Sequence, residues 1–171
     1  MRRIFIVNGP ESSGNRLVGA ILVRAGCWGE ASTNQPKTIS DIPKEPNQVV
    51  WIHPGNFKDT IPALKTVFDE VTVILVIREP EANCRSMVRV GFFQTLKQAN
   101  IARINKIQET INTALESNCK LEIITYEGLS TPMLRLWLPR LGLPVDNLNQ
   151  NLKLVGQLAP TQIRNRNGKY Y

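Results

Sequence analysis

The sequence predicts an α/β fold, a three-layer arrangement in which helices flank a mostly parallel central sheet. Short runs of β-branched and apolar residues alternate with helical patterns along the chain, and this alternation is typical of βαβ units. One run, residues 71–77, is apolar at nearly every position, which indicates a strand buried on both faces, as in parallel sheets. A turn rich in glycine and serine, residues 9–14, joins the first apolar run to the first helical pattern.

One domain, residues 1–171, is expected, because a chain of 171 residues can bury one sizeable core and contains no internal repeat or dividing linker. A hydrophobic content of 42% without a low-complexity tract is typical of a soluble globular protein. No apolar run approaches the roughly 20 residues of a membrane span. The run at residues 4–7 is too short for a signal peptide and is expected to form the first strand.

The net charge indicates the class of ligand that the chain binds, and the cysteine content indicates its cellular compartment. With 21 Lys and Arg against 14 Asp and Glu, the net charge of +7 favours an anionic ligand: a nucleotide, a sulfated or phosphorylated small molecule, or a nucleic acid. The three cysteines are widely spaced and show no paired metal-ligand pattern. A reduced, cytoplasmic protein is therefore expected.

The first half of the chain is expected to form two strands and two helices around a long loop. The first helix follows the turn and ends at Gly26, a typical C-terminal glycine. Residues 27–47 contain three prolines, and loops of this length often serve as binding elements or lids. A second strand at residues 49–52 comes next. It is followed by a helix whose apolar positions are Ile61, Leu64, Val67 and Phe68.

The second half repeats the alternation. After the buried strand, Pro80 suits the first turn of a helix that continues to Val90. Residues 96–117 form a long amphipathic pattern, and its isoleucines are expected to pack in the core. A fourth strand at residues 121–125 and a last helix over about 131–141 complete the prediction.

The turn after the first strand has the spacing of a phosphate-binding loop. Gly9 and Gly14 bracket four residues, and such a loop aims backbone N–H groups and the positive end of the next helix at an anion. In nucleotide hydrolases Lys and Ser/Thr follow, but here the positions hold Asn15 and Arg16. The fold is thus P-loop-like without the lysine and metal chemistry. Arg16 opposes the helix dipole, so either it points into water or a bound polyanion supplies the missing negative charge.

Four candidate segments each follow a strand directly: residues 9–14, His53, Arg78 and Tyr126. In α/β sheets ligands bind beyond the carboxyl ends of the strands, so these segments should converge at one edge. His53 is the only histidine, and it is either structural or a base that takes a proton from an acceptor hydroxyl. The neighbouring Trp51 is expected in the core rather than at an acceptor surface.

Arg78 closes a strand that is otherwise apolar. Its guanidinium presents a fork of donors suited to phosphate or sulfate. The alternative is an ion pair with Glu79 or Glu81. Nucleotide kinases and hydrolases often carry a metal-binding Asp at such a strand end, so a cation there favours anion binding without Mg²⁺.

In these motifs the sequence resembles the sulfotransferases that use 3′-phosphoadenosine 5′-phosphosulfate (PAPS). Residues 9–17 resemble that family's 5′-phosphosulfate loop, and His53 falls where the family carries its catalytic base. Residues 73–80, with Ser86 eight positions after Arg78, resemble the 3′-phosphate motif.

The remaining similarity lies towards the end of the chain. Residues 124–129 and then 141–144 resemble the family's Tyr-Glu-Asp-Leu segment and its closing Leu-Gly-Leu. Arg166 and Gly168 are a weaker match to a further loop that contacts the 3′-phosphate.

The resemblance implies transfer of a sulfuryl group from PAPS to a hydroxyl of a small-molecule or carbohydrate acceptor, leaving adenosine 3′,5′-bisphosphate and needing no metal. His53 would act as base and Arg16 would stabilise the moving group. The residues it implies for PAPS binding are Ser12, Ser13, Gly14, Asn15, Arg16, Arg78, Ser86, Tyr126, Arg166 and Gly168.

Departures from the family pattern leave alternatives open. Ser12 stands where the family has a basic residue, and Arg16, Lys58 or Lys169 would have to replace it. Without a replacement the chain would be a non-catalytic, degenerate nucleotide-binding homologue. A P-loop nucleoside or nucleotide kinase is the other alternative, and Asn15 argues against it. No membrane partner is expected. With only 6% aromatic residues, a nucleic-acid partner is not expected either.

Overall fold

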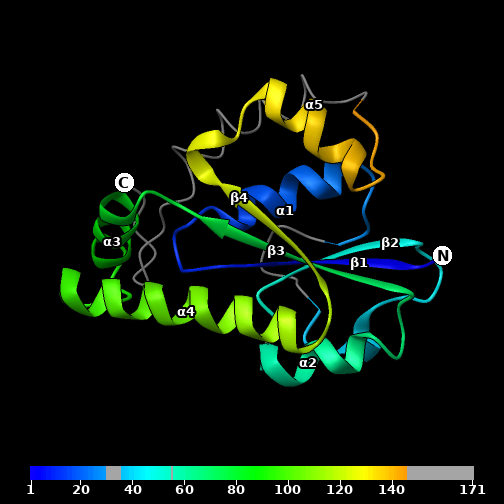
Figure 1. Cartoon of the computed structure of the whole chain (residues 1–171), viewed down its shortest axis with the longest axis horizontal. Coiled ribbons are helices and arrows are strands. Elements are labelled where there is room, and N and C mark those ends of the chain that lie inside the picture. The colour runs from blue at the N-terminus through cyan, green and yellow to red at the C-terminus, as the bar shows by residue number, and fades with distance from the viewer. Residues whose placement is uncertain (30–35, 55, 146–171) are drawn as a thin grey trace.

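The computed structural model describes residues 1–29, 36–54 and 56–145, and these residues form an α/β fold with helices on both faces of a parallel sheet (Figure 1). The predicted fold class is confirmed. The elements in chain order are β1 (Arg3–Asn8), α1 (Asn15–Arg24), η1 (Ile39–Asp41), β2 (Gln48–Ile52), α2 (Phe57–Leu64), β3 (Glu70–Ile77), α3 (Pro80–Arg89), α4 (Leu96–Glu116), β4 (Lys120–Thr125), η2 (Tyr126–Gly128) and α5 (Thr131–Arg140).

The sheet has four strands in the order β2-β1-β3-β4, and every pair is parallel. In its centre Val7 lies opposite Ile52 of β2 and Ile74 of β3. At the far side Ile77 lies opposite Thr125. Because all strands run the same way, their carboxyl ends meet at one edge, and the segments after β1, β2, β3 and β4 start there.

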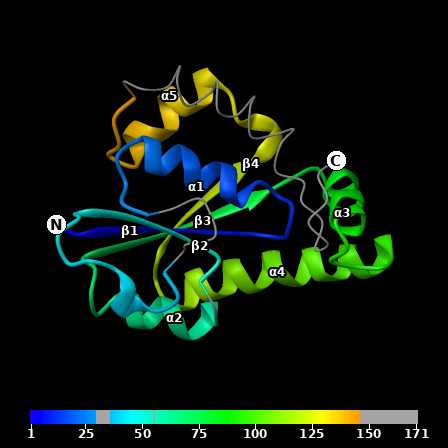
Figure 2. The same cartoon turned by 180° about the vertical axis from the view of Figure 1, so that it is seen from behind.

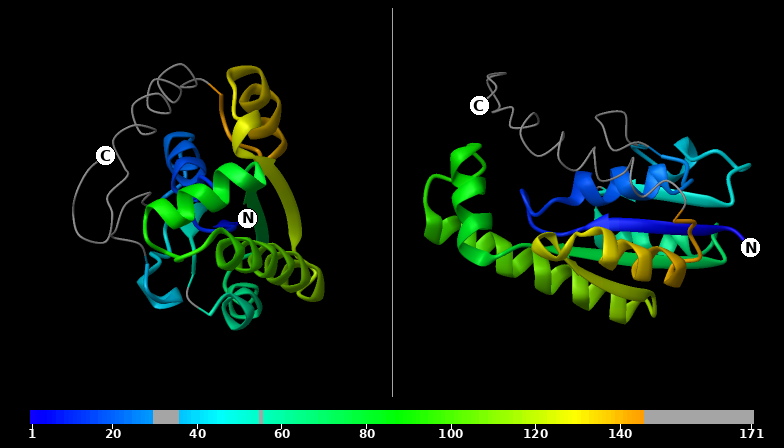
Figure 3. Two further views of the ribbon diagram at one scale, coloured as in Figure 1. Left: turned by 90° about the vertical axis from the view of Figure 1, so that its left-hand side faces the viewer. Right: turned by 90° about the horizontal axis from the view of Figure 1, so that it is seen from above.

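Side chains alternate between the two faces of the sheet, and each face has its own core. Phe5 and Val7 face α1 and α5, whereas Ile4 and Ile6 face the side of α2 and α4 (Figure 2). Trp51 is buried on the second face, as predicted. Helix α3 lies beyond the carboxyl ends of β1 and β3, at one end of the molecule (Figures 1 and 3).

The prediction that the isoleucines of the long helix pack in the core is wrong for two of them. Ile101 is 51% exposed and Ile104 is 39% exposed. The face of α4 that is buried instead carries small side chains, namely Ala99, Thr110, Thr113 and Ala114. Small residues let the helix axis approach its neighbours closely, so the longer side chains are left on the outer face.

Other boundaries differ by a few residues. Helix α2 ends at Leu64, before the expected Val67 and Phe68, although Phe68 is still buried in the turn that follows. Of the predicted loop at residues 27–47, residues 30–35 lie outside the described part. The segment at residues 36–47 is anchored to the rest of the fold at two points. Ile42 is buried in the core, and the Arg2 guanidinium donates to the Pro43 carbonyl. Within the described ranges, no helix combines the length and the apolar character needed to cross a bilayer.

Candidate functional site

The loop between β1 and α1 is tightly folded against the sheet. A Cβ on Gly9 would lie 2.3 Å from the carbonyl oxygen of Val76 on β3, so only glycine lets the loop come this close. Ser13 is buried, and its hydroxyl donates to the Pro10 carbonyl over 2.7 Å. Ser12 and Gly14 have φ angles of 59° and 100°. The loop therefore holds a fixed, curved backbone.

The amino end of α1 is unusually positive. Gly14 is its N-cap, no side chain caps it, and its first turn carries no acidic residue. Helix N-termini leave backbone N–H groups without intrahelical partners, and the helix dipole adds partial positive charge there. Arg16, in the same turn, is exposed. This end of the helix is chemically suited to an anion such as phosphate or sulfate.

Two side chains from the region after β3 hold the loop in place. Nη1 of Arg78 donates to the Ser12 carbonyl over 3.3 Å, and Nδ2 of the fully buried Asn83 donates to the Glu11 carbonyl over 2.7 Å. Arg78 thus reaches the loop that the sequence predicted it would face.

The guanidinium of Arg78 is only partly neutralised. Its Nε lies 3.8 Å from Oε1 of Glu127, an ion pair too long to be a hydrogen bond, so the buried Nε has no hydrogen-bond partner among the described residues. The ion pair with Glu79 or Glu81, which the sequence left as an alternative, is not formed: the Glu79 carboxylate accepts from backbone N–H groups at the start of α3, and Glu81 pairs with Arg85. The Arg78 side chain is 27% exposed, so a ligand can reach its head group, although not the buried Nε.

Tyr126 connects the Arg78 guanidinium with the loop. Its ring lies under that guanidinium, 4.7 Å from centroid to Cζ. The same ring covers Gly14, where an added Cβ would lie 2.5 Å from Cδ2 of Tyr126. The segment after β4 is therefore packed directly on the segment after β1.

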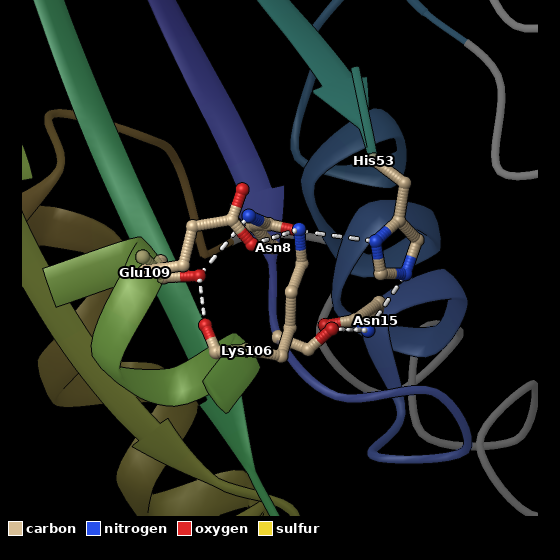
Figure 4. Close-up of polar contacts among 7 residues, drawn as sticks. Asn8, Asn15, His53, Lys106 and Glu109 are labelled. Atoms are coloured by element: carbon tan, nitrogen blue, oxygen red, sulfur yellow. Dashed lines mark hydrogen bonds and ion pairs between the residues drawn. The ribbon is translucent and has the colours of Figure 1, made fainter. Parts of the chain in front are cut away.

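His53 follows β2 in a left-handed conformation, with φ 48°, and its backbone N–H donates to the Val7 carbonyl. Its ring lies between two asparagines (Figure 4): Nδ1 is 3.1 Å from Oδ1 of Asn8, and Nε2 is 2.8 Å from Nδ2 of Asn15. Nδ2 of Asn15 also lies within 3.3 Å of the carbonyls of Gly9 and Pro10, which orients its amide. The contact with Asn15 therefore connects the imidazole to the loop between β1 and α1.

The electrostatic environment keeps His53 neutral. Burial, together with the positive charges of Lys106 and Arg16, lowers the pKa of the imidazole to about 4, and burial is the largest of these causes. Lys106 comes from α4 and pairs with Glu109 over 3.0 Å. At neutral pH the ring is therefore uncharged and has a lone pair on one nitrogen, as a general base requires, although both ring nitrogens contact an asparagine in this structure.

The predicted residues fall into three groups. Brought together at one edge are Ser12, Ser13, Gly14, Asn15, Arg16, His53, Arg78 and Tyr126. Ser86 is half-buried on α3, and within the described ranges its side chain makes no hydrogen bond to Arg78 or to the loop. Lys58 is exposed at the start of α2. Arg166, Gly168 and Lys169 lie outside the described residues.

Sequence reasoning missed four side chains that support this site: Asn8, Asn83, Lys106 and Thr110. Asn8 carried a usable signal, because it is the single polar residue at the end of an apolar strand and directly precedes the loop. Thr110 and Lys106 carried none, since they look like ordinary positions of an amphipathic helix.

Comparison with known proteins adds no assignment. No family model matches the sequence, and a search of curated proteins finds no match.

Proposed function

We propose that this chain is a PAPS-dependent sulfotransferase acting on a hydroxyl of a small-molecule or carbohydrate acceptor, and that it works in the cytoplasm. The observation that carries the proposal is the contact of three elements at one sheet edge. A neutral histidine touches the anion-binding loop through Asn15. A partly exposed arginine touches the same loop through Ser12.

The loop is suited to the phosphosulfate end of the donor. The N–H groups of residues 14–16 and the dipole of α1 would bind the 5′-phosphate and the sulfuryl group, whereas the Ser13 N–H already donates to the Pro10 carbonyl over 3.3 Å. Ser12 cannot supply the cation that related enzymes place in this loop, and Arg16 in the next turn carries the charge instead.

Arg78, Ser86 and Tyr126 would bind the other end of the donor. The fork geometry of the Arg78 head group, on a side chain that is 27% exposed, suits a 3′-phosphate. Ser86 would add a hydroxyl donor, and Tyr126, with the Arg78 guanidinium over its ring, would lie near the adenine. Recognition of the 3′-phosphate would select PAPS over ATP.

His53 would handle the proton. As the acceptor oxygen forms its bond to sulfur, the bond from sulfur to the 5′-phosphate oxygen breaks and its electron pair leaves with adenosine 3′,5′-bisphosphate. The hydroxyl proton passes to Nε2 of His53, which would exchange its Asn15 contact for the acceptor. His53→Ala should abolish turnover and leave donor affinity nearly unchanged.

A non-catalytic nucleotide-binding role is the second candidate. It is favoured by the 2.8 Å contact that occupies Nε2 of His53 and by Ser12 at the position of the usual basic residue. The kinase alternative has less support. Asn15 stands in the position of the kinase lysine, and its amide is turned back onto the loop carbonyls of Gly9 and Pro10.

Thermal unfolding with three nucleotides tests the proposal. Adenosine 3′,5′-bisphosphate at about 100 times its Kd should stabilise the chain by roughly 2.7 kcal/mol, whereas ATP with Mg²⁺ or adenosine 5′-phosphate should do much less. Stabilisation by ATP with Mg²⁺ alone would favour a kinase. Binding of the bisphosphate without sulfuryl transfer from PAPS to any of a panel of hydroxyl compounds would favour the non-catalytic role.

Arg78→Lys sharpens the same test. Loss of a charge-assisted hydrogen bond should weaken adenosine 3′,5′-bisphosphate binding about tenfold or more, with a smaller effect on adenosine 5′-phosphate. Arg85→Lys is the matched control, because Arg85 is an exposed arginine on α3 that pairs with Glu81. Equal losses for both nucleotides would remove Arg78 from 3′-phosphate recognition.

A further inference from the structure

The polar contacts of His53 continue through the sheet into helix α4. Nδ2 of Asn8 donates to the hydroxyl of Thr110 over 3.1 Å, and that hydroxyl donates to the Lys106 carbonyl over 2.8 Å. Asn8 is 1% exposed and Thr110 is 0% exposed. Figure 4 shows this series of side chains running from α4 through the end of β1 to His53. We call Thr110, Asn8, His53 and Asn15 the relay.

Donor and acceptor chemistry gives every hydrogen bond in the relay a direction. The Thr110 hydroxyl has one hydrogen, which it donates to Lys106, so it accepts from the NH₂ group of Asn8. The carbonyl oxygen of the Asn8 amide then faces His53, and this oxygen can only accept. Nδ1 of His53 must therefore carry the hydrogen, and Nε2 holds the lone pair that accepts from Asn15.

We infer that Asn8 and Thr110 are positioning residues, which hold His53 as the Nδ1–H tautomer and aim the lone pair of Nε2 at the loop. The catalytic meaning of this arrangement rests on the proposed function, but the tautomer itself does not. In the reaction proposed above, Nε2 is the atom that takes the acceptor proton. Without the Thr110 hydroxyl, the Asn8 amide would be able to turn over and donate from its NH₂ group to Nδ1, which favours the tautomer with the hydrogen on Nε2.

The charged groups around the imidazole come from α1 and α4. Lys106 from α4, with its partner Glu109, and Arg16 from α1 face the imidazole, while β1 contributes the uncharged amide of Asn8. No carboxylate touches the ring nitrogens within the described residues. An aspartate at position 8 would still accept from Nδ1–H, but it would favour the protonated ring and raise the His53 pKa.

His53 is the only histidine of the chain, so ¹⁵N NMR of the full-length protein reports on it without ambiguity. The wild type should show a single neutral Nδ1–H tautomer with no ligand present. Thr110→Val, which keeps shape but removes the hydroxyl, should give a mixture of tautomers. Thr110→Ser, which keeps the hydroxyl, should again show the single Nδ1–H tautomer. Thr113→Val is the matched control, because Thr113 is also buried on α4 but lies outside the relay.

Asn8→Asp tests the relay by a different route and should keep the Nδ1–H tautomer while raising the pKa of His53. An Nε2–H tautomer in the wild type would overturn the inference. So would a Thr110→Val protein whose tautomer matches that of Thr113→Val. If Thr110→Val does not fold, the wild-type tautomer and the Asn8→Asp titration still decide the matter.

Activity separates this inference from the proposed function. If PAPS is a substrate, Thr110→Val should lower kcat by up to about 100-fold with little change in the KM for PAPS, since it disturbs the base and not the donor site. A correct tautomer with no sulfuryl transfer leaves the relay intact and removes the sulfotransferase proposal. Sulfuryl transfer by a protein whose His53 is the Nε2–H tautomer would support the sulfotransferase proposal and overturn the relay.

Discussion

His53 couples the protonation state of one residue to the stability of the whole chain. Its ring lies partly buried between two amides, and burial together with Lys106 and Arg16 lowers its pKa to about 4. An unfolded chain would titrate near 6.5. The folded state therefore resists protonation over the window between these two values.

The first prediction is a loss of stability in acid. The unfolded chain binds a proton that the folded chain excludes, so this contribution is fully present above pH 6.5 and is lost as the pH falls toward 4. The loss from this group is on the order of 3 kcal/mol. Urea unfolding from pH 8 to pH 4 measures it. His53→Gln should remove this part of the pH dependence, and an identical profile in that variant would exclude the histidine as its source.

At the scale of elements, the two glycines that flank helix α1 have the same backbone conformation but different surroundings. Gly14 and Gly26 flank helix α1 and have nearly the same φ angle, 100° and 101°. A Cβ on Gly14 would lie 2.5 Å from the Tyr126 ring, whereas nothing lies within 4 Å of one on Gly26. Alanine substitutions at these two glycines therefore differ mainly in the contact with Tyr126, so the difference between their unfolding free energies reports on that contact.

The second prediction compares the two alanine variants. Gly26→Ala should cost about 1–2 kcal/mol for the left-handed backbone alone. Gly14→Ala should cost more, because Tyr126 must move, and should also weaken adenosine 3′,5′-bisphosphate binding if the proposed function is correct. Equal free energies of unfolding for both variants would mean that the Tyr126 ring yields freely.

The apolar periodicity of residues 96–117 correctly predicted helix α4, but it assigned the wrong face of that helix to the core. Its buried side is made by small residues such as Ala114, and Ile101 lies in the exposed stripe. Apolar residues are common on protein surfaces, so an isoleucine at helical spacing does not by itself mark the core.

The third prediction follows from this packing. Ile101→Ala should change the free energy of unfolding by less than about 0.5 kcal/mol, whereas Ala114→Ile should cost about 1–3 kcal/mol through overpacking. Chemical denaturation of the two variants at one pH provides the comparison. A large loss in Ile101→Ala would show that another part of the chain covers this stripe in solution.

At the scale of the whole molecule, the parallel sheet decides where chemistry can occur. Four strands running the same way place the segments after them at one edge, so residues far apart in sequence become neighbours. The contacts of Arg78 with Ser12, of Tyr126 with Gly14 and of Asn15 with His53 all cross this edge. The same topology brings Thr110 of α4 to the end of β1.

The sequence by itself determined the fold class, the order of strands and helices, and the gathering of the loop, His53, Arg78 and Tyr126 at one edge. It could do so because alternation of apolar patterns and glycine spacing are local properties. A strand end followed by a polar residue is visible without knowing its neighbours.

Only the tertiary structure decided which partner each of these residues has. Arg78 faces Glu127 rather than Glu79 or Glu81, α4 buries alanine and threonine rather than its isoleucines, and Asn8 joins Thr110 to His53. These choices depend on distances between segments up to about 100 positions apart. Such distances are set by how closely the layers pack, and that packing leaves no periodic pattern in the sequence.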